Sequence, residues 1–226
     1  MSTLLLRLAA PLQAWGDDSR FNIRRTYSIP TKSGVLGMLA SALGRRRNEK
    51  NQDLRTLRMG VRVDQPGESL EDFQMVHGTK QSDITRRFYL SDAVFLVGME
   101  HSDEAFLEKI QQALKNPVYP LFLGRRACPP SFPLVLGIRE TGLKEALQQE
   151  PWLSAEWRKN RLDSHLRLIL EDDGDPFSVR HRLKDEPVSF NPDCRSYQYR
   201  YVREAGYVDR MEIHDTEHDA FGELGG

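Results

Sequence analysis

Residues 92–117 read DAVFLVGMEHSDEAFLEKIQQALKNP, a mainly apolar run followed by an amphipathic pattern. The run Asp92–Met99 is apolar enough to form a buried strand. The group Ser102-Asp103-Glu104 is typical of a helix start, and Asn116-Pro117 closes the helix because proline cannot continue it. The stretch therefore predicts a strand followed by a helix. The apolar face of that helix would consist of Phe106, Ile110, Ala113 and Leu114.

A second strand and helix are expected nearer the N-terminus. Leu4–Ala9 reads as a buried strand, which Pro11 ends. Thr31 or Ser33 can cap a helix over Gly34–Leu43. Two further strands are expected at Val61–Val63 and Leu134–Ile138. The order strand, helix, strand, strand, helix, strand is the ferredoxin-like pattern of an α+β domain, which is also the scaffold of RRM-like RNA-binding domains.

The segment Gln65–Tyr89, between the second and third of these strands, is too long for an ordinary hairpin connection. Its end, Ile84–Tyr89, can extend as a strand directly into Asp92–Met99. Apolar side chains such as Phe73 and Met75 argue against the alternative of a disordered loop. We therefore expect a protruding β-hairpin, called the thumb, at about residues 65–90.

The chain of 226 residues is expected to have two parts. Residues 1–140 would form a ferredoxin-like RNA-binding domain that includes the thumb. Residues 141–226 would form a smaller, β-rich C-terminal part, which is either a small second subdomain or an elaboration that wraps the first. Its expected elements are a helix at Leu143–Leu153 and strands at Leu166–Leu170 and Tyr197–Val202.

Charge is distributed unevenly along the chain. Residues 1–62 contain twelve Lys/Arg against four Asp/Glu, whereas residues 204–226 contain one Arg against seven acidic residues. A basic N-terminal region suits a polyanion, and an acidic tail does not. The alternative is a chance segregation of charge over a solvated surface.

Several features indicate a cytoplasmic protein. The longest apolar runs have the length of strands, so no membrane span is expected. Met1–Ala10 lacks the charged leader and long apolar centre of a secretory signal. Cys128 and Cys194 lie far apart, without the spacing of a zinc site, as suits a reducing compartment. His214 and His218 have a spacing that could bind a metal on a helix, but they lie in the acidic tail. We expect neither a metal nor a cofactor.

The segment Pro30–Gly37 has the composition of an anion site. A helix start with free backbone amides, the hydroxyl of Ser33 and the ammonium of Lys32 would attract phosphate, and Gly34 would allow close backbone approach. Arg24-Arg25 would add positive charge. The aromatic rings of Trp15 and Tyr27 offer faces for stacking bases. The alternative is an ordinary capped helix.

Two other segments have nucleic-acid-binding character. Arg125-Arg126 lie in a stiff loop between a glycine and two prolines, where arginine forks suit phosphate oxygens. In the expected thumb, charged side chains are combined with aromatic groups, as is typical of single-strand binding. These thumb residues are His77, Lys80, Arg86, Arg87 and Tyr89. The alternative is metal-independent RNA cleavage, in which Tyr27, His77 or Lys80 would move protons during attack by a 2′-hydroxyl.

Four blocks, in order, resemble the signature of the CasD family, the handle-binding subunits of type I-E Cascade, which are CRISPR-associated RAMP-type proteins. The blocks are Leu6–Gly16, Pro30–Leu39, Arg87–Ala93 and Tyr119–Pro129. An ordered set of this kind is far more specific than one glycine motif. Within these blocks, the resemblance implies RNA contacts at Trp15, Lys32, Ser33, Gly34, Arg125 and Arg126.

The resemblance further implies a ferredoxin-like domain with a thumb at one end of the guide-RNA filament. Such a subunit grips the 5′ handle of the CRISPR RNA (crRNA). It also contacts the backbone subunit CasC and the large subunit CasA. The family in type I-E systems is not expected to cleave RNA, whereas a sister subtype does cleave it with tyrosine, lysine and histidine groups. A purely structural adaptor is a third possibility.

Overall fold

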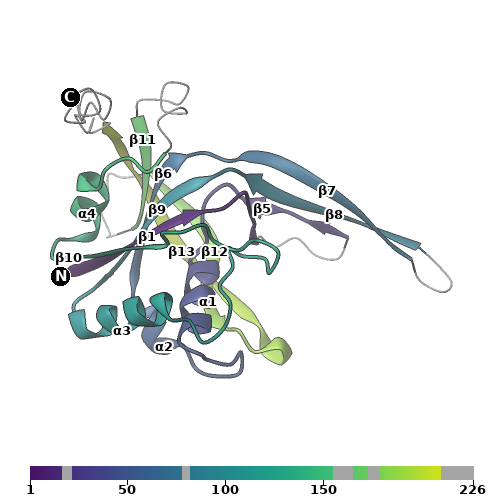
Figure 1. The fold of residues 1–226 in the computed structure, drawn as a ribbon, viewed down its shortest axis with the longest axis horizontal. Coiled ribbons are helices and arrows are strands. Elements are labelled where there is room, and N and C mark those ends of the chain that lie inside the picture. The colour runs from purple at the N-terminus through teal and green to yellow at the C-terminus, as the bar shows by residue number, and fades with distance from the viewer. Residues whose placement is uncertain (17–21, 78–81, 155–164, 173–178, 210–226) are drawn as a thin grey trace, which may run out of the picture.

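The computed structural model describes residues 1–16, 22–77, 82–154, 165–172 and 179–209 (Figure 1). Within these residues, the largest sheet has seven strands in the order β10-β1-β9-β6-β11-β13-β12. All neighbouring strands in it are antiparallel. The strands are β1 (Ser2–Ala9), β6 (Arg58–Gln65), β9 (Val94–His101), β10 (Val135–Arg139), β11 (His165–Glu171), β12 (Arg180–Ser189) and β13 (Ser196–Asp209).

Helices pack on both faces of this sheet, which explains why its central strands are apolar on both sides. Alternate residues of a strand point to opposite faces. Leu4 of β1 therefore joins the core beneath two helices, while Leu5 joins a second core under a third helix. The helices are α1 (Lys32–Ala42), α2 (Gln52–Arg55), α3 (Glu104–Lys115) and α4 (Leu143–Gln149), of which α1 and α3 cover the first face and α4 the second.

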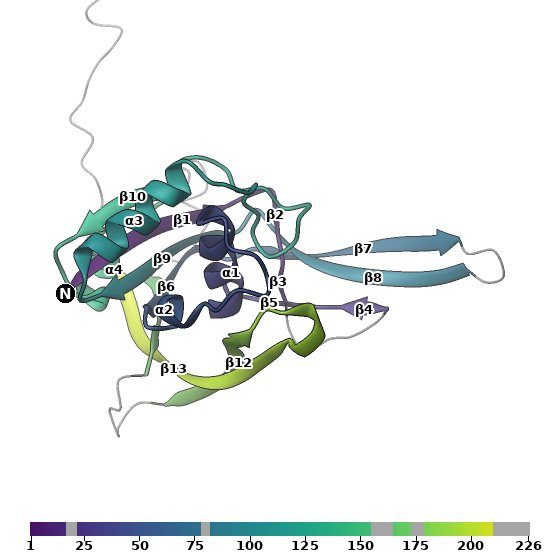
Figure 2. The same cartoon turned by 90° about the horizontal axis from the view of Figure 1, so that it is seen from below.

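The strands β7 (Glu68–His77) and β8 (Ser82–Ser91) form a long antiparallel hairpin. It projects away from the seven-stranded sheet (Figures 1 and 2). Its base belongs to a smaller sheet of order β2-β8-β4, and β3 pairs with β5 beside it. These short strands are β2 (Leu12–Gln13), β3 (Trp15–Gly16), β4 (Ile23–Arg24) and β5 (Thr26–Tyr27).

The structure is thus a mixed α/β protein with mostly antiparallel sheets. Each helix and strand expected in the first 140 residues is present within a few residues of its predicted bounds. Thr31, rather than Ser33, caps α1, because its hydroxyl accepts from the amide of Gly34. The helix expected at Leu143–Leu153 ends at Gln149.

The strands β11, β13 and β12 continue the same sheet beyond β6, and of these three only β12 was not predicted. A short 3₁₀ helix, Pro192–Cys194, connects β12 to β13. The acidic tail beyond Asp209 lies outside the described residues. Among the helices that the structure describes, none is long and apolar enough to cross a membrane.

Candidate RNA-binding site

The side chain of Arg125 connects three segments that are distant in the sequence. Its guanidinium carbon lies 4.6 Å from the centroid of the buried Tyr89 ring, a distance typical of a cation–π contact. Its Nη2 donates to the backbone carbonyl oxygen of Arg24 at 2.8 Å. Arg125 therefore holds its own loop and β4 together at the base of the hairpin.

The loop that carries Arg125 packs directly on the N-terminal segment. The amide of Ala14 donates to the carbonyl oxygen of Leu123 at 3.2 Å. Gly124 has a φ of +84°, and a Cβ atom there would lie 1.6 Å from the carbonyl oxygen of Ala14. Only glycine permits both the backbone conformation and this close approach. The position of Arg125 thus depends on the glycine that precedes it.

Arginine side chains surround this contact. Arg24 lies opposite Arg87 in the parallel pairing of β4 with β8, and Arg87 is half-buried. Arg86, the residue before Arg87 on β8, forms an ion pair with Glu71 at 3.4 Å. The exposed arginines of this neighbourhood are Arg24, Arg25, Arg86 and Arg126. The fold therefore gathers the predicted residues 24–25, 86–89 and 125–126 into one basic surface, which we call the arginine surface.

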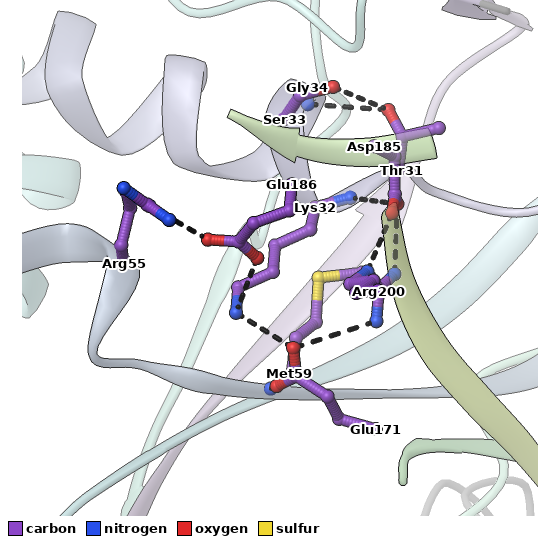
Figure 3. A network of polar contacts seen from close by, with 10 residues as sticks. All are labelled: Thr31, Lys32, Ser33, Gly34, Arg55, Met59, Glu171, Asp185, Glu186 and Arg200. Atoms are coloured by element: carbon purple, nitrogen blue, oxygen red, sulfur yellow. Dashed lines mark hydrogen bonds and ion pairs between the residues drawn. The ribbon is translucent and has the colours of Figure 1, made fainter. Parts of the chain in front are cut away.

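Lys32 does not belong to this surface. Its side chain is 5% exposed, and its ammonium lies 2.8 Å from Glu171 Oε1 and 2.9 Å from Glu186 Oε2 (Figure 3). Arg55 shares Glu186 at 3.1 Å. An ammonium that two carboxylates already neutralise is not placed to neutralise a phosphate. The structure thus assigns Lys32 to the attachment of α1 to β11 and β12.

The start of α1 already has an anion, which belongs to the protein itself. The backbone amide of Lys32 donates to Asp185 Oδ2 at 2.8 Å. Asp185 is buried, and Arg200 holds it with two hydrogen bonds of 2.6 and 2.9 Å. The helix N-terminus therefore attracts negative charge as the sequence predicts, but a carboxylate from β12 takes the place that RNA was expected to fill.

Trp15, Ser33 and Gly34 also differ from their expected roles. Trp15 is 1% exposed, so its ring is not available for stacking on a base. A Cβ atom on Gly34 would lie 2.9 Å from that ring, so the glycine makes room for tryptophan rather than for a backbone. The half-buried Ser33 lies 3.5 Å from the Thr31 hydroxyl at the helix cap. These residues pack on one another at the start of α1.

Tyr27 and His77, two of the three residues proposed for RNA cleavage, are not brought together. Tyr27 lies on β5, where it pairs with Trp15 near the body of the molecule. His77 pairs with Ser82 at the outer end of the hairpin. The nearest point of β8 that touches β4 is Arg86, four residues or about 13 Å further along the strand. Lys80 lies outside the described residues, as do His214 and His218.

Among the described residues, no group of three or more His, Cys, Asp or Glu could hold a metal ion.

Cys128, in the loop that carries Arg125, is not placed to act as a nucleophile. Burial raises the pKa of the Cys128 thiol. A buried thiol with a raised pKa is a poor nucleophile. Its position two residues after Arg126 therefore reflects packing of the loop.

The carboxylates of the Lys32 network were missed by sequence reasoning. Glu171, Asp185 and Glu186 lie at least 139 residues after Lys32, so no local pattern connects them to it. A weak signal existed in the stretch Lys184-Asp185-Glu186-Pro187, which places two acids before a proline. The role of these two acids could not be inferred from this stretch, because it depends on the tertiary contact that brings β12 alongside α1.

The architecture and the arginine surface together define an α+β protein of the kind found in solved CRISPR assemblies. A chain of a CRISPR RNA-guided surveillance complex is 33% identical with a TM-score of 0.78, covering 92% of this chain and 91% of that one. The crystal structure of a Cas protein is 41% identical with a TM-score of 0.70, covering 92% of this chain and 95% of that one.

Similarity in sequence identifies the family to which this chain belongs. The CRISPR system Cascade subunit CasD of Escherichia coli (strain K12) is 33% identical over 174 residues, which are 66% of this chain and 78% of that protein. The model of the CRISPR-associated protein family Cas_Cas5 matches residues 3–203. The chain belongs to this Cas5 family. The family resemblance stated from the four sequence blocks is therefore confirmed.

Proposed function

We propose that this chain is a non-catalytic, cytoplasmic subunit of a type I-E CRISPR interference (Cascade) complex, in which it binds and caps the 5′ handle of crRNA. The observation that carries the proposal is the arginine surface. Arg24, Arg25 and Arg126 are exposed there beside a backbone that the Arg125–Tyr89 contact makes rigid. Membership of the Cas5 family and the likeness to a CasD subunit support it.

Several finer assignments accompany this proposal. The strands β1, β6, β9 and β10 with α1 and α3 have the order of a ferredoxin-like domain. We assign this domain to residues 1–140 and the C-terminal elaboration to residues 141–226. The hairpin β7–β8 is the thumb. The proposed RNA contacts are Arg24, Arg25, Arg86, Arg87 and Arg126, with Arg125 and Tyr89 acting as positioning residues.

The thumb is proposed to contact the backbone subunit CasC. Met75 and Ile84 are opposite one another in the hairpin register, and Phe73 lies on the same face. These side chains are 50%, 44% and 54% exposed, which is unusual for apolar groups that have no partner in an assembly. CasA, the large subunit, is proposed as the second protein neighbour.

Handle binding is tested with fluorescein-labelled handle RNA and the purified chain. Each phosphate contact in a single strand contributes about 0.7 to the slope of log K against log salt concentration. The triple variant Arg24→Gln/Arg25→Gln/Arg126→Gln should therefore lower that slope by about two. Equal binding of a scrambled RNA, or an unchanged slope in the variant, would contradict the proposal.

A matched control removes the same charge elsewhere. Arg46, Arg47 and Lys50 are exposed in the segment that follows α1. They follow the C-terminal end of this helix, whereas the arginine surface is built from β4, β8 and the loop of Arg125. The triple Gln variant at these positions should leave the slope for handle RNA unchanged.

The proposed absence of catalysis is tested by incubating repeat RNA with the purified protein in the presence of a metal chelator. Specific cleavage of the RNA would overturn this part of the proposal.

The contact with CasC is tested by co-purification. Phe73→Ser/Met75→Ser should reduce the amount of CasC recovered with the chain. Leu70→Ser is the matched control, because Leu70 is 41% exposed but lies on the opposite face of the same hairpin. Equal losses in both variants would show that the hairpin surface as a whole, rather than this apolar face, determines recovery.

A further inference from the structure

The outer face of the ribbon β12–β13 carries a row of exposed tyrosines. Tyr199 and Tyr201 are each 51% exposed, and Tyr197 is half-buried. Arg200, between Tyr199 and Tyr201, and Val202, after Tyr201, are buried and point the other way. Neighbouring tyrosines on one face of a strand are about 6.6–6.8 Å apart along the chain. The row thus offers ring faces at regular intervals.

Cations lie between these rings. The guanidinium carbon of Arg182 lies 3.6 Å from the centroid of the Tyr199 ring, and Arg182 is opposite Tyr201 in the strand register. Arg195 lies 5.4 Å from the Tyr197 ring and donates to its hydroxyl. Within the described residues, neither arginine forms an ion pair with a carboxylate. Their positive charge is therefore presented beside aromatic faces and is not neutralised by an acid.

The inner face of the same ribbon has the opposite character. Asp185 and Arg200 are buried there in the network that fixes the start of α1, and Val202 joins the main core. The ribbon lies at the edge of the sheet with α1 on its inner side (Figure 2). The side chains of the inner face are thus covered by packing and by internal ion pairs. The exposed tyrosines of the outer face, with Arg182 and Arg195 beside them, have no such role within the described residues.

The cations continue along this outer face. Arg180 is opposite Arg203 in the strand register, and Asp172 pairs with Arg180 at 3.0 Å. Asp172 thus offsets the charge of Arg180, whereas no carboxylate of the described residues pairs with Arg182 beside Tyr199.

We propose that the outer face of β12–β13 is a second nucleic-acid-binding surface, which takes a single-stranded polynucleotide without regard to sequence. Exposed aromatic rings interleaved with arginines match the two requirements of such a site, which are stacking platforms for bases and cations for phosphates. Arg182 and Arg195 would contact phosphates or stack on bases, and Tyr199 and Tyr201 would each stack on one base. This surface is distinct from the arginine surface, to which none of its residues belongs.

The test uses the full chain with excess unlabelled handle RNA, so that the arginine surface is occupied. Fluorescein-labelled (dT)12 and (U)12 are then titrated, and the affinity is measured by fluorescence anisotropy. Loss of one stacked base weakens binding by about five-fold or more. The variant Tyr199→Ala/Tyr201→Ala should therefore raise the Kd by about 25-fold or more, if the two losses add. Comparison of the two oligonucleotides shows whether DNA or RNA is preferred.

Three further variants make the test specific. Tyr199→Phe/Tyr201→Phe keeps the rings and should keep the affinity. Arg182→Gln should lower the salt slope by about 0.7 for one phosphate. Tyr207→Ala is the matched control, because Tyr207 is 62% exposed on the same strand but its ring pairs with His165 at 6.2 Å. It should bind as the wild type does.

The proposal is overturned if the wild-type chain binds neither oligonucleotide, or if the alanine pair binds both as tightly as wild type. A duplex that competes as well as the single strands would also overturn it, because paired bases cannot stack on the rings. Handle RNA affinity is measured in parallel on every variant and should not change. If the chain does not bind handle RNA, the oligonucleotide titration is repeated without it. The two proposals can therefore fail independently of one another.

Discussion

Replacement of Lys32 by methionine separates a structural role of this lysine from contact with RNA. Methionine keeps most of the length of the side chain and removes its charge. Glu171 and Glu186, which lie 2.8 and 2.9 Å from the ammonium, would then lose their central partner. The network would change from three cations and three carboxylates to two cations and three carboxylates, in a region where Lys32 is 5% exposed.

The expected cost follows from the burial of these groups. Removing one partner of a buried ion pair typically costs about 3–5 kcal/mol, because the remaining charge is left uncompensated. Arg55 still pairs with Glu186, and Arg200 lies 3.9 Å from Glu171, so we expect the lower end, about 3 kcal/mol. At about 2–4 °C per kcal/mol for a chain of this size, the Tm should fall by roughly 6–12 °C.

Urea unfolding followed by circular dichroism measures the free energy of unfolding. The double variant Lys32→Met/Glu171→Gln should recover part of the loss, because Glu171, whose remaining cation Arg200 is 3.9 Å away, is the carboxylate left least compensated. Lys50→Met, at an exposed position, is the control and should change stability by less than about 0.5 kcal/mol. Handle RNA affinity is measured at a temperature where all variants are folded, and it should equal that of wild type. A Lys32→Met protein with unchanged stability and weakened handle binding would refute this reasoning.

Two further predictions concern the loop that carries Arg125. Gly124→Ala should destabilise the protein by more than about 2 kcal/mol in thermal unfolding, because the new Cβ would meet the Ala14 carbonyl. Gly206→Ala, with a φ of +89° and nothing within 4 Å of the new Cβ, should cost about 1–2 kcal/mol, and equal losses would contradict the clash. Ellman's reagent should label Cys194 rapidly in the native protein and Cys128 only on unfolding, since burial raises the pKa of the Cys128 thiol. Rapid labelling of both thiols would show that the loop opens.

The elements of the first 140 residues could be predicted because their signals are local. Asp103 caps α3 by accepting from the amide of Phe106, and Asn116 ends this helix one residue before a proline. The strand Val94–His101 is apolar along nearly its whole length because helices cover both faces of its sheet. Alternation, capping and breaking residues are all visible within a dozen residues of sequence.

The strands after residue 140 could be predicted less well, because their pattern depends on tertiary partners. β12 contains exposed cations together with the buried Asp185, and it pairs with β13 through a register that shifts twice. Its inner carboxylates are compatible with a sheet only because α1, Arg55 and Arg200 supply the opposite charges. Without these partners, the sequence of β12 is a polar stretch with no regular alternation, so it does not predict a strand.

The candidate site illustrates the same limit for function. The start of α1 binds an anion, as its sequence indicates, but the local sequence does not show which anion binds there. Asp185, 153 residues from Lys32, is attached to the protein and therefore competes at a high effective concentration with any free phosphate. The prediction for Arg24 and Arg25 rests on charge alone, and that for Arg126 rests on loop composition and the family resemblance, yet the fold leaves all three exposed.

Internal pairing therefore explains which of the predicted cations remain candidates for RNA. A lysine or arginine near α1 meets carboxylates from β11 and β12 and is used in holding the sheet to the helix, as Lys32 and Arg200 are. Near the base of the hairpin, Arg125 meets a carbonyl oxygen and an aromatic ring, and these neutral partners leave its charge in place. Arg86 of the same hairpin pairs with Glu71 at 3.4 Å but stays exposed. The same distinction holds on β12–β13, where Arg182 contacts Tyr199. A cation with an aromatic or carbonyl partner is positioned by the fold and still attracts phosphate, so such residues mark the surfaces where a nucleic acid would bind.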